Sequence, residues 1–364
     1  MKDYIERYNK PESKQISKSL EICFSDMKCN MNCAYCYGDH KNRTFNNSRP
    51  LNKEVLLKEF EKLTVPIADV HLWGGELTFN EKEFKDAVSF VKEALPGVPI
   101  RMVTNGLLLP QWTDFFIENE ISLAISHDGP GQKYRGEDFL KKKEHNDAIK
   151  RLYDHKLFCK FKVVHHSKNW STEAIINYFS KYSDLIERKV GCDIMLIYPN
   201  SLSGNSFLFK TEEDKQNLFN DTVWSVTNIV KNIKNQSYLS RYYQDFEVMR
   251  IIKLLNKFYF NAPTTHIPVC CGLDCVAFTS DGKKIPCHCF SEKSVIVQDI
   301  ETDFSYIKEN CYKCKYGYLC GGGCVAKTKE EFDLFCDYSR VYYSAIEQTI
   351  LAIKDKNNFL EEIK

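Results

Sequence analysis

Three cysteines near the start of the chain have a spacing that suits a metal cluster. Cys29, Cys33 and Cys36 form the pattern CxxxCxxC directly after an alternating apolar run that predicts a strand. A cubane of four irons needs four ligands, so three thiolates would leave one iron open, as in catalytic rather than structural metal sites. The alternative from these residues is a structural zinc site, whose fourth ligand could be Cys23 or His40.

Fourteen of the sixteen cysteines fall into two groups at opposite ends of the chain, and Cys159 and Cys192 lie between them. Four lie within the first 36 residues, and ten lie between Cys270 and Cys336. The first residues are charged and contain no apolar signal segment, so we expect a cytoplasmic protein with reduced thiols. In such a protein, cysteines at short spacings are candidate metal ligands rather than disulfides.

The composition excludes several classes of partner. The chain has 364 residues and is 43% hydrophobic, which is enough for a substantial core. Its net charge of +1 gives no basic surface for nucleic acid or an anionic membrane. No apolar run approaches the length of about 18 residues that a membrane-spanning helix needs. We therefore expect neither nucleic acid nor a membrane as a partner.

Six predicted strands alternate with predicted helices in the first part of the chain. This alternation favours a parallel α/β sheet, either a partial barrel or, as the alternative, a doubly wound open sheet. A doubly wound sheet usually has a Gly-rich loop after its first strand, and here the cysteine pattern stands in that place. The predicted strands are 19–26, 67–73, 100–103, 121–125, 161–164 and 192–198.

Small and polar residues follow each of the first four strands. After the cysteine pattern, these groups are Gly74-Gly75-Glu76, Thr104-Asn105-Gly106 and Ser126-His127-Asp128-Gly129. The carboxyl ends of parallel barrel strands form one face, where the active sites of barrel enzymes lie. We therefore expect these groups to meet at the mouth of the barrel.

These motifs, in this order, resemble those of the radical S-adenosylmethionine (SAM) superfamily, over residues 18 to 200. The resemblance implies that an open iron is chelated by SAM, and that a cluster electron then releases a 5′-deoxyadenosyl radical. It also implies roles for individual residues. Gly74 and Gly75 would approach the methionine moiety, Glu76 would accept from its ammonium, Tyr35 would lie against the adenine, and Thr104, Asn105, Ser126 and Asp128 would position the ribose and the methionine carboxylate.

The cysteine-rich end of the chain resembles the SPASM extension of that superfamily. The match consists of Gly282-x4-Cys287, the pattern CxxCx5Cx3C from Cys311 to Cys324, and Cys336. A pair of zinc knuckles is the alternative. The resemblance implies two auxiliary clusters, so that three [4Fe-4S] clusters and SAM are the expected cofactors. Cluster I would take Cys271 (or its neighbour Cys270), Cys275, Cys287 and Cys324; cluster II would take Cys311, Cys314, Cys320 and Cys336; Cys289 has no assigned role.

The expected architecture is therefore an α/β partial (β/α)6 barrel followed by a helical bridge and a small SPASM domain that binds auxiliary Fe–S clusters. We expect the barrel over 1–205, the bridge over 206–266, the SPASM domain over 267–340 and a C-terminal helix over 341–364.

The resemblance also implies the class of reaction. SPASM-bearing members mostly modify peptides or proteins, so we expect an oxidoreductase that crosslinks or oxidises a ribosomally made peptide. His288 follows Cys287, where sulfatase-maturating members have an aspartate base, and is the candidate catalytic residue. Such a sulfatase-maturating enzyme, a small-molecule dehydrogenase and a zinc-binding scaffold are the alternatives. The short segment before Cys29 leaves no room for a leader-binding domain, so a separate leader-peptide-binding protein is a possible partner, beside an electron donor such as flavodoxin or ferredoxin.

Overall fold

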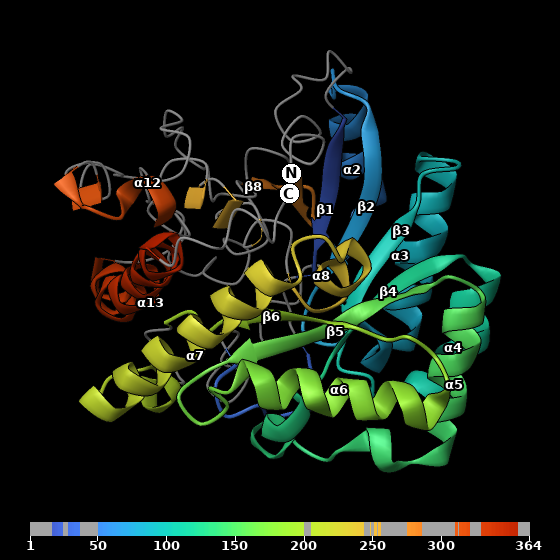
Figure 1. The fold of residues 1–364 in the computed structure, drawn as a ribbon. Coiled ribbons are helices and arrows are strands. Elements are labelled where there is room, and N and C mark those ends of the chain that lie inside the picture. The colour runs from blue at the N-terminus through green and yellow to red at the C-terminus, as the bar shows by residue number, and fades with distance from the viewer. Residues whose placement is uncertain are drawn as a thin grey trace.

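One eight-stranded sheet forms the centre of the structure, which is a computed structural model (Figure 1). The structure describes residues 17–24, 28–36, 50–199, 205–243, 248, 251–252, 254–255, 275–285, 310–311, 313–320 and 329–355. The strand order is β6-β5-β4-β3-β2-β1-β7-β8, and β1 to β6 pair in parallel with their sequence neighbours. Each crossover thus moves one position in the same direction, which confirms the partial barrel and not the doubly wound sheet. The strands are β1 (Lys18–Cys23), β2 (Ile67–Trp73), β3 (Ile100–Thr104), β4 (Ile121–Ser126), β5 (Phe158–His165), β6 (Cys192–Leu196), β7 (Cys275–Thr279) and β8 (Lys284–Ile285).

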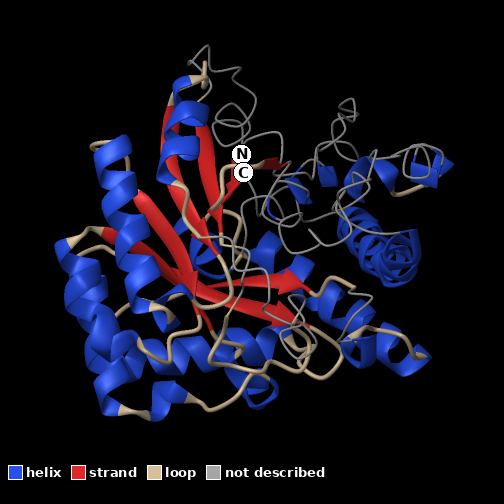
Figure 2. Ribbon diagram, turned by 180° about the vertical axis from the view of Figure 1, so that it is seen from behind, coloured by secondary structure: helices blue, strands red, loops and turns tan. Residues whose placement is uncertain are grey.

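Helices that follow the barrel strands lie along the outside of the curved sheet (Figures 1 and 2). They pack on strand residues such as Leu20, Ile22, Val70 and Leu72, all almost completely buried. The helices that connect the strands are α2 (Lys53–Glu61), α3 (Glu81–Ala94), α4 (Leu109–Glu118), α5 (Lys143–Asp154) and α6 (Thr172–Ile186). Short 3-10 turns follow three strands: η1 (Leu77–Phe79), η2 (Gly129–Tyr134) and η3 (Phe139–Lys141).

The opposite face of the sheet is polar. Glu21 pairs in register with His71, His71 with Arg101, and Arg101 with Ser122, so one row of polar side chains crosses four strands. Alternation along each strand sends these residues to the face opposite the helices. A parallel sheet normally buries apolar side chains on both faces. The concave side of this barrel is therefore a polar surface rather than a second core.

Strand β7 was not predicted from the sequence. It comes from the cysteine-rich segment, pairs in parallel with β1, and places Cys275 opposite Ser19. Gly282 closes the β7–β8 turn with φ +91°, and a Cβ there would lie 2.3 Å from a side-chain carbon of Val55. Only glycine suits such a position. This hairpin therefore belongs to the barrel sheet, although it falls within the segment 267–340.

Among the described residues, a 3-10 turn and three helices of seven or more residues lie beyond the barrel strands, and two of these helices pack side by side. Tyr338 of α13 donates a hydrogen bond to the carbonyl of Ile197, which follows β6, at 2.5 Å. This contact fixes α13 at the carboxyl end of the barrel, and the boundary expected at 341 falls inside that helix. The elements are η4 (Asn205–Phe207), α7 (Glu212–Lys231), α8 (Gln236–Tyr242) and α13 (Lys329–Asp355), of which α7 and α13 are in contact.

In the described part of the chain, no helix combines the length and apolar character that crossing a bilayer requires.

Candidate functional site

The predicted cluster ligands lie in a loop at the carboxyl end of β1, residues 28–36, called here the cysteine loop. Backbone hydrogen bonds hold it in place: Glu76 N–H donates to the Lys28 carbonyl at 2.7 Å, and Ala34 N–H donates to that of Tyr134 at 3.0 Å. Cys36 N–H donates to the Cys33 carbonyl at 3.1 Å, which closes a tight turn between these two ligands. The loop is thus fixed by the segments after β2 and β4.

The three thiols are half-buried, and the surroundings of Cys29 and Cys33 favour the neutral form. Burial raises the pKa of Cys29 to about 11, and burial also raises the pKa of Cys33. A bound metal would reverse this preference, because metal coordination deprotonates a thiol. Among the residues that the structure describes, no three His, Cys, Asp or Glu side chains gather closely enough to hold a single metal ion. His40, the alternative zinc ligand, lies outside the described residues.

Glu76 is the centre of the polar contacts at the barrel mouth. It is 2% exposed, and its carboxylate accepts hydrogen bonds from the hydroxyls of Thr78 (2.6 Å) and Thr104 (2.9 Å) and from the backbone N–H of Asn105 (2.6 Å). Burial outweighs these donors and raises the pKa of Glu76. No Lys, Arg or His among the described residues forms an ion pair with it. A cationic group of a ligand would therefore stabilise the carboxylate.

The two glycines before Glu76 sit where β2 ends. A Cβ on Gly74 would lie 2.8 Å from a side-chain carbon of Leu77. Gly75 lines a small cavity together with Glu76 and Lys28. This position beside the cysteine loop agrees with the close approach to a ligand that the sequence predicts, and the ligand role itself remains a prediction.

Tyr35 of the cysteine loop contacts Asp128, which follows β4. The Tyr35 hydroxyl donates to one oxygen of the fully buried Asp128 carboxylate, and the backbone N–H of Val164 donates to the other at 3.0 Å. Burial raises the pKa of Tyr35 well above its usual value, so the hydroxyl remains the donor. Asp128 thus ties the loop to β5, and its contact with ribose remains a prediction.

Arg135 was missed by the sequence reasoning. Its guanidinium lies 3.3 Å from the Tyr35 hydroxyl and 4.0 Å from the Asp128 carboxylate, and its buried Nε has no hydrogen-bond partner among the described residues. Burial alone would lower its pKa, but Tyr35, Asp128 and Cys33 raise it, so the cation persists. A buried charge of this kind is costly unless it is paired. No motif of the sequence singles out Arg135, because its position depends on the turn η2.

Four aromatic side chains pack together beside the cysteine loop and are called here the aromatic box: Tyr35, Tyr134, His166 and Phe207. The His166 ring centroid is 4.9 Å from that of Tyr35 and 5.0 Å from that of Phe207. His166 is fully buried. Burial lowers the pKa of His166 to about 3. Its Nδ1 accepts from the Lys168 N–H at 3.2 Å, so Nε2 carries the proton, and Nε2 has no hydrogen-bond partner in the described part of the chain. Ser126, the remaining predicted ligand, is half-buried at the end of β4.

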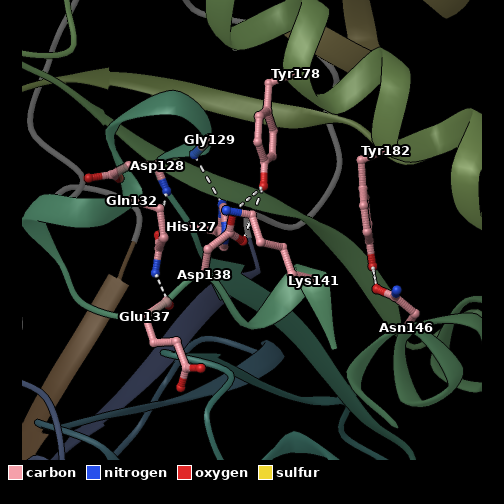
Figure 3. Close-up of polar contacts among 10 residues, drawn as sticks. All are labelled: His127, Asp128, Gly129, Gln132, Glu137, Asp138, Lys141, Asn146, Tyr178 and Tyr182. Carbon is pink, nitrogen blue, oxygen red and sulfur yellow. Dashed lines mark hydrogen bonds and ion pairs between the residues drawn. The ribbon is translucent and has the colours of Figure 1, made fainter. Parts of the chain in front are cut away.

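His127 has a structural role (Figure 3). Its Nδ1 accepts from the Gly129 N–H at 3.0 Å, and its Nε2 lies 3.0 Å from Asp138. The Tyr178 hydroxyl donates to the same Asp138 carboxylate at 3.1 Å. Burial lowers the pKa of His127, so the ring is neutral and donates from Nε2. These contacts hold the turn that carries Asp128.

We expect His127 to make folding sensitive to mild acid. The unfolded chain binds a proton below pH 6.5, while the buried ring resists it, so stability falls as the pH drops below that value. One such proton contributes at most about 1.4 kcal/mol per pH unit. Urea unfolding at pH 7.5 and 5.5 should show a smaller loss in His127→Asn than in the parent chain. The exposed His155→Asn is the control and should behave like the parent. An unchanged loss in His127→Asn would contradict this assignment.

Five predicted auxiliary ligands are described. Cys275 is buried in β7, while Cys311, Cys314, Cys320 and Cys336 are half-buried. The Cys314 N–H donates to the Cys311 carbonyl at 3.2 Å, as in a tight ligand turn, and Cys320 lies in the short helix α12 (Gly317–Cys320). The remaining predicted residues, Cys270, Cys271, Cys287, His288, Cys289 and Cys324, lie outside the described residues.

Comparisons with known proteins relate this arrangement to one family. Residues 27–179 match the model of the radical SAM superfamily. The serine-type anaerobic sulfatase-maturating enzyme of Bacteroides thetaiotaomicron is 29% identical over 162 residues, which are 42% of this chain and 38% of that protein. The chain therefore spans well under half of that relative's length in the match.

Solved structures of anSMEcpe share the fold over most of the chain. For the structure with bound AdoMet, the TM-score is 0.59 and the sequence identity is 18%, and the match spans 93% of this chain and 99% of the anSMEcpe chain. For the structure with bound AdoMet and Cp18Cys peptide, the TM-score is 0.58 and the sequence identity is 18%, and the match spans 93% of this chain and 98% of the anSMEcpe chain. At this identity the likeness concerns the fold.

Proposed function

This chain belongs to the radical SAM superfamily through residues 27–179, and from that premise we propose that it is a maturase that uses SAM to modify a peptide or protein side chain. Its C-terminal region is of the SPASM type, on the cysteine pattern from Cys270 to Cys336 and the shared fold. The observation that carries the proposal is the direct contact among three motifs. Asn105 hydrogen-bonds both Glu76 and the thiol of Cys29.

The residues present fit a [4Fe-4S] cluster at the cysteine loop. Cys29 Sγ accepts from the Met31 N–H at 3.4 Å and from Asn105 Nδ2 at 3.7 Å. A neutral thiol is a weak acceptor, whereas a metal-bound thiolate is a strong one, so these donors suit a loaded site. The buried charge of Arg135 near Cys33 would balance the negative charge of a thiolate-bound cluster. Cys29, Cys33 and Cys36 would hold the cluster.

The chain's own residues would bind and orient SAM. The cluster, when bound, supplies the electron that splits the sulfonium bond of SAM. Glu76 would accept from the SAM ammonium, because its buried carboxylate has no cationic partner among the described residues. The buried Nε of Arg135, which has no partner within the described ranges, would donate to the carboxylate of the same moiety. The aromatic box beside the loop offers ring faces, and a donor on His166, to a planar base. Burial of these groups would keep water from the reacting atoms.

A peptide is the substrate class that we propose. The anSMEcpe structures include complexes with peptides, and the fold shared with them covers 93% of this chain. Our leading reaction is crosslinking or oxidation of a ribosomally made peptide, with two auxiliary clusters and His288 as the base. Oxidation of a sulfatase Cys or Ser is the second candidate, favoured by the curated relative. An electron donor such as flavodoxin or ferredoxin, a separate leader-binding protein and a cytoplasmic setting that keeps thiols reduced complete the proposal.

Mass spectrometry of substrate peptides tests this function. The protein would be reconstituted anaerobically with iron and sulfide, then incubated with SAM and reductant. One sample receives a short precursor peptide encoded beside the gene, and the other receives a sulfatase-derived peptide in Cys and Ser versions. Loss of hydrogen from the precursor alone supports crosslinking or oxidation of a ribosomally made peptide. Conversion of the sulfatase peptide alone would replace that reaction with the second candidate. A control enzyme with its own substrate peptide would show that the assay conditions work. If this chain then cleaves SAM and leaves both peptides unchanged, the peptide proposal is contradicted.

A further inference from the structure

Two N–H groups point at the sulfur of one predicted cluster ligand. The backbone N–H of Met31 donates to Cys29 Sγ at 3.4 Å, and the side-chain amide of Asn105 donates at 3.7 Å. The first donor belongs to the cysteine loop itself. The second comes from the end of β3, far away in the sequence, and its presence beside the sulfur therefore depends on the tertiary fold.

The orientation of the Asn105 amide is determined by its other contacts. Its Oδ1 accepts from the Leu107 N–H at 3.0 Å, so the opposite end, Nδ2, faces the cysteine loop. One Nδ2 hydrogen reaches Asn30 Oδ1 at 2.7 Å, and the other is available to Cys29 Sγ. The residue is 6% exposed. Water therefore competes little for these donors, and rotation of the amide would break both the Leu107 and the Asn30 contacts.

Asn105 also connects the sulfur to the proposed binding group for SAM. Its backbone N–H donates to Glu76 at 2.6 Å, while its side chain donates to Cys29. A single residue thus spans the distance between the carboxylate and the cluster ligand. The motif Gly74-Gly75-Glu76 and the cysteine loop would keep a fixed separation through this residue.

We propose that Asn105 is a positioning residue that sets the reduction potential of the first cluster through its N–H···S hydrogen bond to Cys29, an inference that rests on the proposed function. Reduction adds negative charge to the cluster, and this charge is shared with its thiolate ligands. An N–H donor stabilises that added charge and raises the reduction potential. Without the donor, the cluster is harder to reduce. This role differs from the contact with SAM that the sequence predicts for Asn105.

A redox titration of Asn105→Leu tests the proposal. Leucine has a similar shape but no N–H donor. The reconstituted full chain would be titrated without SAM and followed by electron paramagnetic resonance, using the signal that changes when SAM is added to a separate sample. We expect the equilibrium constant for one-electron reduction to fall about ten-fold, which corresponds to a potential about 59 mV more negative. Asn119→Leu, at the end of α4, is the matched control and should show no shift, since its amide donates only to the Phe115 carbonyl among the described residues.

A second variant separates the tuning role from a purely structural one. Asn105→Asp keeps the oxygen that accepts from Leu107 and removes the N–H donor, so it should also titrate at a lower potential. A SAM-responsive cluster that titrates at the parent potential in either variant would overturn the inference. Failure of both variants to assemble this cluster, while the parent assembles it, would overturn it in favour of a structural role. Absence of any SAM-responsive cluster from the parent chain would instead refute the proposed function.

Discussion

Replacement of Cys33 by alanine should abolish SAM cleavage and remove one cluster. Cys33 shares a tight turn with Cys36, and among the neighbouring charges Arg135 has the largest effect on its pKa. Cys23, which could be thought to replace it, is almost completely buried at the end of β1. With two thiolates left, the cluster would lose a corner, and iron should fall from about twelve to about eight per chain if three cubanes are bound. Iron analysis and chromatography of 5′-deoxyadenosine measure both effects.

The control for this experiment is Cys159→Ala. Cys159 is exposed at the start of β5. It belongs to neither predicted group of ligands, so its loss should leave iron content and SAM cleavage unchanged. Cleavage at the parent rate in Cys33→Ala would contradict the assignment of Cys33 as a ligand.

Replacement of Cys314 by alanine should stop product formation and spare SAM cleavage. The chain packs tightly between Cys311 and Gly317. A Cβ on Gly317 would lie 2.1 Å from the Cys311 carbonyl oxygen, so only glycine fits at this position. Cys314 sits within this turn, as expected of a ligand. Its loss should remove about four irons from cluster II, while the cysteine loop at the other end of the chain keeps its own cluster. Parallel assays of 5′-deoxyadenosine and of modified peptide separate the two steps.

The neighbouring Lys315→Ala is the matched control for Cys314→Ala. The exposed Lys315 ammonium pairs with Glu347 of α13 at 2.5 Å, and it offers no metal ligand. We expect parent levels of iron, SAM cleavage and product. If Cys314→Ala also makes product at the parent rate, the second auxiliary cluster is not needed for turnover.

The barrel could be predicted because local and global signals agree. Alternating apolar residues mark β1 and β2, and the helices between strands have clear apolar faces, so the order of elements follows from periodicity alone. The convergence of Glu76, Asn105 and the cysteine loop then follows from the geometry of parallel strands. The hydrogen bonds among them confirm that prediction.

Other features depend on long-range contacts that no local pattern encodes. Strand β7 is stabilised by pairing with β1, more than 250 positions away, and its five residues are too short for periodicity to identify. Arg135 gains its place from a 3-10 turn, which has no strong sequence signal. The burial of His166 depends on Tyr35 and Phe207, which come from distant segments. The amide of Asn105 was expected to face SAM, and only the fold shows it facing a sulfur.

The most direct test of the open iron is Mössbauer spectroscopy of the protein reconstituted with iron-57, with and without SAM. If Cys29, Cys33 and Cys36 hold three corners of a cubane, one iron has no protein ligand, and its isomer shift should change when SAM binds through nitrogen and oxygen. The change should be absent from Cys33→Ala. A spectrum that is identical with and without SAM, or a chain that takes up zinc in place of iron at these cysteines, would contradict the account.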